Sequence, residues 1–130
     1  MATANIWDIK HFHFQKESGI TDIGTTAQEV CRLVTPNLPA GTYFIRYAFE
    51  VDYNGTKDKP GFFQLMGTFP DAAAFSGSAS ANGGDKRNRL YGYPKVWAGG
   101  VMTIWLEMWK DAGVSQLDCD YVDIMVERVA

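Results

Sequence analysis

The stretch PAGTYFIRYAFEVDY, from Pro39 to Tyr53, carries the clearest β-strand pattern in the sequence. From position 43 every odd residue is apolar or aromatic, whereas Arg46, Glu50 and Asp52 occupy even positions. A period of two places alternate side chains on opposite faces and predicts a strand with one buried face. Six large side chains each contribute roughly 1.5–3 kcal/mol on burial, so we expect this strand to be central and covered by a second layer.

The turn signals around this strand divide the rest of the chain. Asn54-Gly55 follows it directly, and this dipeptide tolerates the positive φ angles of a tight turn, which predicts a hairpin where the chain reverses. Ser18 to Thr26 and Ser76 to Asp85 are rich in small and polar residues and predict loops, the second of them long and exposed. Pro36 and Pro39 predict the end of the segment before the central strand.

About eight strands are predicted in total. Gln28 to Thr35 also fits a short amphipathic helix, and Asp71 to Phe75 fits either a single helical turn or a short edge strand. In the last segment, Leu117 to Val129, the apolar residues alternate in one phase up to Tyr121 and in the opposite phase after it. This change predicts a β-bulge or a strand that crosses between sheets. The segments are Ile6 to Gln15, Gln28 to Thr35, Tyr43 to Tyr53, Gly61 to Phe69, Asp71 to Phe75, Arg87 to Trp97, Val101 to Trp109 and Leu117 to Val129.

Strands at this spacing, without a convincing long helix, predict an all-β fold in a single domain over residues 1–130. Eight strands in two antiparallel sheets form a β-sandwich, and we expect it to be jelly-roll-like. The two cysteines, Cys31 and Cys119, could form a disulfide. Two buried thiols are the better prediction, because we expect the chain to be made in a reducing cytoplasm.

Composition and charge exclude several function classes. The chain has 12 basic and 15 acidic residues, a formal net charge of −3, and no cluster of basic residues interleaved with aromatics, so we expect no nucleic-acid partner. Its apolar runs are short and its first residues resemble no secretion signal, so we expect no membrane partner.

Two segments carry candidate interface residues. In Val101 to Trp109, alternate residues Met102, Ile104, Leu106 and Met108 predict a core face. The opposite face places Trp105 and Trp109 on either side of Glu107, a composition typical of a surface that another protein covers, although the two rings could equally pack under a loop. The first strand alternates bulky residues on both faces, and its candidate interface residues are Trp7, Ile9, His11 and His13.

No residue pattern predicts a catalytic, cofactor or metal site, and we expect a protein that is not an enzyme. His11 and His13 could chelate a metal from one strand face, but no further ligand stands at a recognisable spacing, so an ordinary partly buried or interfacial pair is the preferred interpretation. Asp118, Asp120 and Asp123 could bind calcium or act as paired acids. The preferred interpretation is that they keep an exposed strand soluble and discourage edge-to-edge pairing.

Three segments resemble the C1q/tumour-necrosis-factor-like jelly roll. They are LPAGTYFIRYAFEV, with its Gly-Thr-Tyr strand start, AGGVMTIWLEMW, with its Ala-Gly entry, and LDCDYVDIMVERV, with its Leu-Asp opening. Gly99-Gly100 departs from the more usual Gly-Asp pair. The chain is also similar to capsid decoration (cement) proteins of tailed bacteriophages. That resemblance implies a homo-oligomer, with a trimer favoured, on the capsid surface of a virion, with the major capsid protein as partner and no catalysis.

Two functions follow. The first is a structural protein that stabilises a shell by binding further copies of itself and its capsid subunits through aromatic surfaces. The second is a carbohydrate- or receptor-binding module of a phage fibre or tail, in which exposed aromatic rings would stack on a glycan beside carboxylates. A flat apolar surface would favour the first function, and a groove with aromatics beside carboxylates would favour the second.

Overall fold

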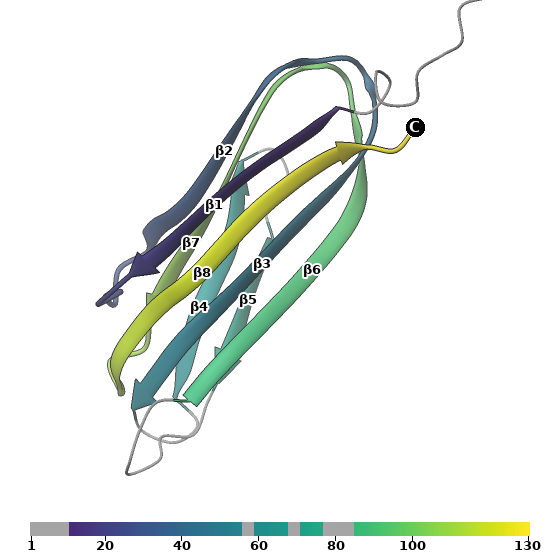
Figure 1. The fold of residues 1–130 in the computed structure, drawn as a ribbon. Coiled ribbons are helices and arrows are strands. Elements are labelled where there is room, and N and C mark those ends of the chain that lie inside the picture. Colours follow the sequence, from purple (N-terminus) through teal and green to yellow (C-terminus); the bar gives the residue numbers. More distant parts are fainter. Residues whose placement is uncertain (1–10, 56–58, 68–70, 77–84) are drawn as a thin grey trace, which may run out of the picture.

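The computed structural model describes residues 11–55, 59–67, 71–76 and 85–130, and all eight of its elements are β-strands (Figure 1). This confirms the predicted all-β class. Their bounds are β1 Phe12–Ile20, β2 Gln28–Leu38, β3 Gly41–Gly55, β4 Pro60–Gly67, β5 Asp71–Ser76, β6 Asp85–Trp97, β7 Gly100–Lys110 and β8 Val114–Arg128. Within the part of the chain that is described, no helix is long and apolar enough to cross a membrane.

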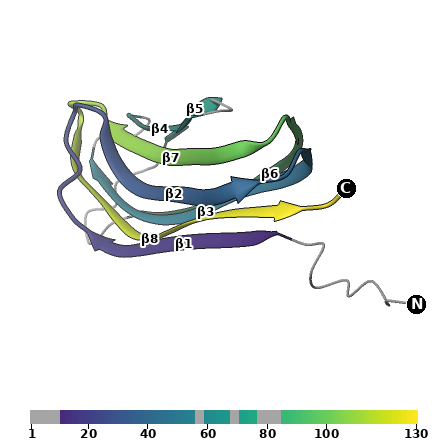
Figure 2. The same cartoon turned by 90° about the horizontal axis from the view of Figure 1, so that it is seen from above.

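The strands form two four-stranded sheets packed face to face (Figure 2). Sheet A has the order β1-β8-β3-β6 and sheet B the order β2-β7-β4-β5, and every hydrogen-bonded pair is antiparallel. Only β4 and β5 are consecutive strands of one sheet, and every other connection passes from one layer to the other. Such interleaved sheets are those of a jelly roll, so the predicted sandwich is confirmed.

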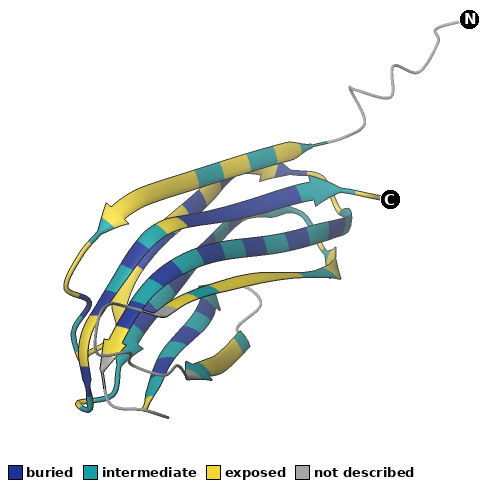
Figure 3. Cartoon of the chain, turned by 60° about the horizontal axis from the view of Figure 1, so that its bottom comes forward, coloured by how far each residue is buried: buried dark blue, intermediate teal, exposed yellow. Residues whose placement is uncertain are grey.

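The core lies between the sheets and is centred on β3, as the alternation predicts. The odd-numbered side chains of β3 from Tyr43 to Tyr53 are all buried, and β3 itself lies between β8 and β6. Phe63 of β4 meets them from sheet B, with ring centroids 5.1 Å from Phe49 and 5.9 Å from Tyr47. Figure 3 shows the resulting alternation of buried and less buried residues along the central strands.

The predicted hairpin at Asn54-Gly55 is wrong. β3 pairs with β6 and β8, whereas β4 belongs to the other sheet. The dipeptide does stand where the strand ends, but a turn signal is local and does not decide which sheet the next strand joins. Burial decides it, because Phe63 can cover Phe49 only from the opposite layer.

The ends of β1 and β2 also differ from expectation. β1 continues to Ile20, which pairs with Cys119, so the predicted loop begins later than Ser18. The start predicted at Ile6 lies outside the described residues. β2 is a strand and not a helix, and it passes through Pro36 to Leu38. As an edge strand with a register shift at this point, β2 accommodates a proline that has no N–H to donate.

The predicted β-bulge is confirmed, as is the burial of both cysteines. The register between β3 and β8 shifts opposite Asp120, so Cys119 and Val122 both face the core while Tyr121 is exposed. Cys31 and Cys119 are free, and burial raises the pKa of each thiol to about 12. The segment Asp71–Ser76 is a short edge strand. Of the loop predicted after it, residues 77–84 lie outside the described residues.

Candidate functional site: the outer faces of the two sheets

Trp105 and Trp109 lie on the outer face of sheet B, as predicted, and both are half-buried. The Trp105 indole N–H donates to Glu107 Oε2 at 2.7 Å, and the Arg32 guanidinium carbon lies 4.5 Å from the Trp105 ring centroid. Trp109 stacks on Phe62 of β4, with centroids 5.2 Å apart and ring planes 15° apart. The two rings are therefore held by neighbours on their own sheet. Their interface role stays a prediction.

A small hollow, lined mostly by apolar atoms, adjoins the outward residues Trp105, Glu107 and Trp109, which we call the tryptophan surface. Gln64 Nε2 donates to Glu107 Oε1 at 3.0 Å, which places an amide and a carboxylate between the two indoles. Gln64 and Met66 also line a hollow of about 170 Å³, which Asp71 enters from β5. This surface therefore combines aromatic rings with polar groups that can donate and accept hydrogen bonds.

The predicted interface residues of the first strand are only partly described. Trp7 and Ile9 lie outside the described residues. His11 and His13 are half-buried, with ring centroids 6.4 Å apart, and burial, with a smaller contribution from His11, lowers the pKa of His13. His13 pairs with the buried Val126 and so faces the core side of sheet A. In the described part of the chain, no group of three or more His, Cys, Asp or Glu side chains is placed to hold a metal ion.

The outer face of sheet A carries apolar residues that sequence reasoning missed. The odd residues of β3 face the core, so its even residues and their register partners face outward. Register partners on neighbouring strands form rows across the sheet. One outward-facing row contains Phe12 of β1 and Phe44 of β3, and the next contains Phe14, Met125 and Gly92. We call the following set the apolar band: Phe12, Phe14, Phe44, Leu90, Gly92 and Met125.

An ion pair lies in the middle of the apolar band. Arg46 stands between Met125 and Gly92, and its Nη2 lies 3.5 Å from Oδ1 of Asp123. Asp123 is only 5% exposed although it belongs to the outer face, and the Tyr121 hydroxyl donates to its Oδ2 at 2.8 Å. A third of the Arg46 side chain remains exposed, so an ion pair that water partly reaches interrupts the apolar band at its centre.

The far end of the same face is acidic. Lys86 Nζ lies 3.1 Å from Asp120, 3.2 Å from Asp52 and 3.5 Å from Glu50, and its hydrogen bonds to Asp120 and then to Asp52 raise its pKa. The predicted aspartate cluster is divided, because Asp123 pairs with Arg46 instead. These aspartates also do not protect a sheet edge, since β8 lies between β1 and β3.

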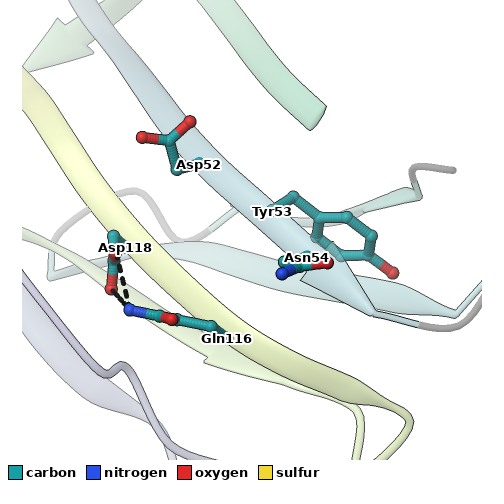
Figure 4. Close-up of a pocket in the computed structure, with 5 residues that line it drawn as sticks. All are labelled: Asp52, Tyr53, Asn54, Gln116 and Asp118. Atoms are coloured by element: carbon teal, nitrogen blue, oxygen red, sulfur yellow. Dashed lines mark hydrogen bonds between the residues drawn. The ribbon is translucent and has the colours of Figure 1, made fainter. Parts of the chain in front are cut away.

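A polar pocket of about 220 Å³ opens beside these carboxylates, between β3 and β8 (Figure 4). Asp118 accepts hydrogen bonds from Gln116 Nε2 at 3.0 Å and from the Asp22 backbone N–H at 2.8 Å. Asp52 is the register partner of Asp118 and lines the same pocket with Asn54. Both carboxylates already have partners, Lys86 for Asp52 and these donors for Asp118, so the pocket is a satisfied surface network.

Comparison with known proteins gives structural neighbours only. No protein-family model matches the chain, and a search of curated proteins finds no match. Dimeric latent PorU from Porphyromonas gingivalis aligns with a TM-score of 0.59 and 10% identity over 92% of this chain, which corresponds to 13% of that chain. The likeness establishes the fold alone. PRD1 vertex protein P5 aligns with a TM-score of 0.45 and 10% identity, covering 92% of this chain and 96% of that chain. Neither neighbour is described as C1q- or TNF-like, so that resemblance stays a prediction.

Proposed function

We propose that this chain is a structural protein, a jelly-roll subunit that associates with further copies of itself and decorates a bacteriophage capsid. The observation that carries the proposal is that apolar side chains lie on the outer faces of both sheets, opposite the core. Leu90 is 68% exposed and Phe12 is 55% exposed on sheet A, and Val34 and Val101 are exposed on sheet B. Exposed apolar side chains on both outer faces give the molecule two surfaces that a neighbouring protein could cover.

The proposed mechanism is binding without catalysis. Covering the tryptophan surface or the apolar band with a neighbouring subunit would remove apolar area from water, at roughly 25 cal/mol per Å². Each subunit so placed would stabilise its neighbours against separation. The partners would be other copies of this chain, in a trimer, and the major capsid protein, at the outer surface of a virion. The strand starts quoted above and the jelly-roll strand order support this choice.

Co-sedimentation with empty capsids tests the proposal. The chain is expected to pellet with capsids, and the double substitution Trp105→Ala and Trp109→Ala is expected to weaken binding at least about tenfold, the scale of two lost interface anchors. Val129→Ala is the matched control, because Val129 is exposed but lies outside both apolar surfaces. A wild-type chain that stays in the supernatant at every concentration would refute the capsid role.

A carbohydrate-binding function is the second candidate. Trp105, Glu107 and Gln64 form a row of aromatic and polar side chains beside the hollow that contains Asp71. Such a row could stack on a sugar ring and hydrogen-bond its hydroxyls. A glycan array distinguishes the two functions: specific glycan binding that Trp105→Ala abolishes would favour this candidate, and an array without signal would favour assembly.

A further inference from the structure

We propose that the apolar band on sheet A binds the amino-terminal segment, residues 1–10, of a second copy of this chain. The inference rests on the proposed assembly function and deepens it, since it names the surface and the segment through which two copies meet. The proposed contact lies on sheet A and does not involve the tryptophan surface of sheet B.

The band is exposed at Phe12, Phe14 and Leu90, whereas Met125 in its middle is only 8% exposed. A Cβ atom at Gly92 would lie 2.4 Å from the tip of the Phe44 ring, so the ring lies against the glycine backbone and not above the sheet. Phe14 is 40% exposed at one side of the band and Leu90 is 68% exposed at the other. An extended chain can therefore lie across all four strands, from β1 to β6, with a large apolar side chain at each end to contact.

The size of the band argues for a segment and against a face-to-face dimer. Four strands about 4.8 Å apart and three rows of side chains about 7 Å apart give a surface of roughly 200–400 Å². A stable dimer buries about 800 Å² on each partner, at least twice what the band offers. A short extended segment with two or three large apolar side chains fits an area of this size, because each of those side chains covers only a small part of the sheet.

The segment before β1 has the composition and the position to be this occupant. It reads MATANIWDIK, and its apolar residues Ile6, Trp7 and Ile9 lie within four positions of one another. Ten residues reach about 33 Å when extended. The segment directly precedes β1, whose first residue, Phe12, belongs to the first row of the band. Its length is sufficient to reach the band of a neighbouring copy.

Charge does not select the occupant. Arg46 is already paired with Asp123, and Glu127 lies between Phe12 and Phe44 in the first row of the band. The proposed contact therefore rests on the apolar side chains of the segment.

Cysteine crosslinking on the full-length chain tests the proposal. Ile9→Cys and Leu90→Cys are made in separate chains, mixed and treated with a short thiol-reactive crosslinker. We expect a product of twice the chain mass in this mixture, and at least about tenfold less when Ile9→Cys is mixed with Val34→Cys. Val34 is the matched control because it is 56% exposed on the other sheet, and the native thiols are buried and do not compete.

Three outcomes would overturn the proposal. They are the absence of a product, an equal yield with the Val34→Cys control, or a crosslink within one chain when Ile9→Cys and Leu90→Cys are combined and diluted, which would place the segment on its own sheet. The proposed function fails in a different way. If light scattering shows an oligomer but the crosslink is absent, only this contact is wrong. If the chain stays monomeric at every concentration, the assembly function itself is refuted.

Discussion

Replacing Trp105 and Trp109 together by alanine perturbs both the fold and the proposed assembly, and the structure allows the first cost to be calculated. Trp105 loses a cation–π contact with Arg32, worth about 0.5–1 kcal/mol at an exposed site, and a hydrogen bond to Glu107, worth about 1 kcal/mol. Trp109 loses its stacking on Phe62, worth about 0.5–1.5 kcal/mol. The free energy of unfolding should therefore fall by about 2–4 kcal/mol.

Urea unfolding followed by far-ultraviolet circular dichroism measures this cost. With a slope of about 1–3 kcal/mol per molar urea, the midpoint should fall by roughly 0.7–4 M, and the slope should not change. Trp105→Phe with Trp109→Phe is the control, because it keeps an aromatic ring at both positions and removes the pyrrole part of each indole with its N–H. An unchanged midpoint would refute the contacts that we assign to the two rings. A double alanine variant that assembles at wild-type concentration would exclude this surface from the interface.

Three further predictions follow from single residues. Gly67→Ala should lower the free energy of unfolding by at least about 2 kcal/mol in the same urea assay, because φ is +103° and the new Cβ would lie 2.1 Å from the Thr103 carbonyl oxygen; a neutral effect would contradict this backbone geometry. Cys31 and Cys119 should resist thiol reagents at pH 8 until urea is added, since burial raises the pKa of both to about 12, and fast native labelling would contradict their burial. Burial raises the pKa of Tyr93 from about 10 to about 12, so its contribution to stability is complete below pH 10 and is lost as pH rises to 12; spectrophotometric titration with Tyr93→Phe as reference should show this late ionisation, and its absence would refute the assignment.

Local patterns in the sequence were sufficient to predict the strands, because each strand displays its own alternation. The burial of Tyr43 to Tyr53, the bulge before Tyr121 and the outward tryptophans all follow from residues close together in the chain. The Asn54-Gly55 hairpin failed because sheet membership depends on contacts between distant strands. Pro36 misled for a related reason, since a proline ends a central strand but not an edge strand.

The apolar band could not be predicted in the same way, because its residues come from four strands and only the register brings them together. Phe12 and Phe14 are close in sequence, but Leu90 and Met125 belong to distant segments. One signal was present in the sequence: Phe44 is a large aromatic at an even position of the central strand, out of phase with the core. An aromatic residue on the outer face of a central strand indicates a second apolar surface.

Light scattering of the purified 130-residue chain over a dilution series shows whether copies of the chain associate. One chain has a mass of 14.5 kDa. We expect a mass that is a multiple of this value, three times for the proposed trimer, and that decreases on dilution as the contacts dissociate. A constant mass of one chain across the whole series would contradict this expectation.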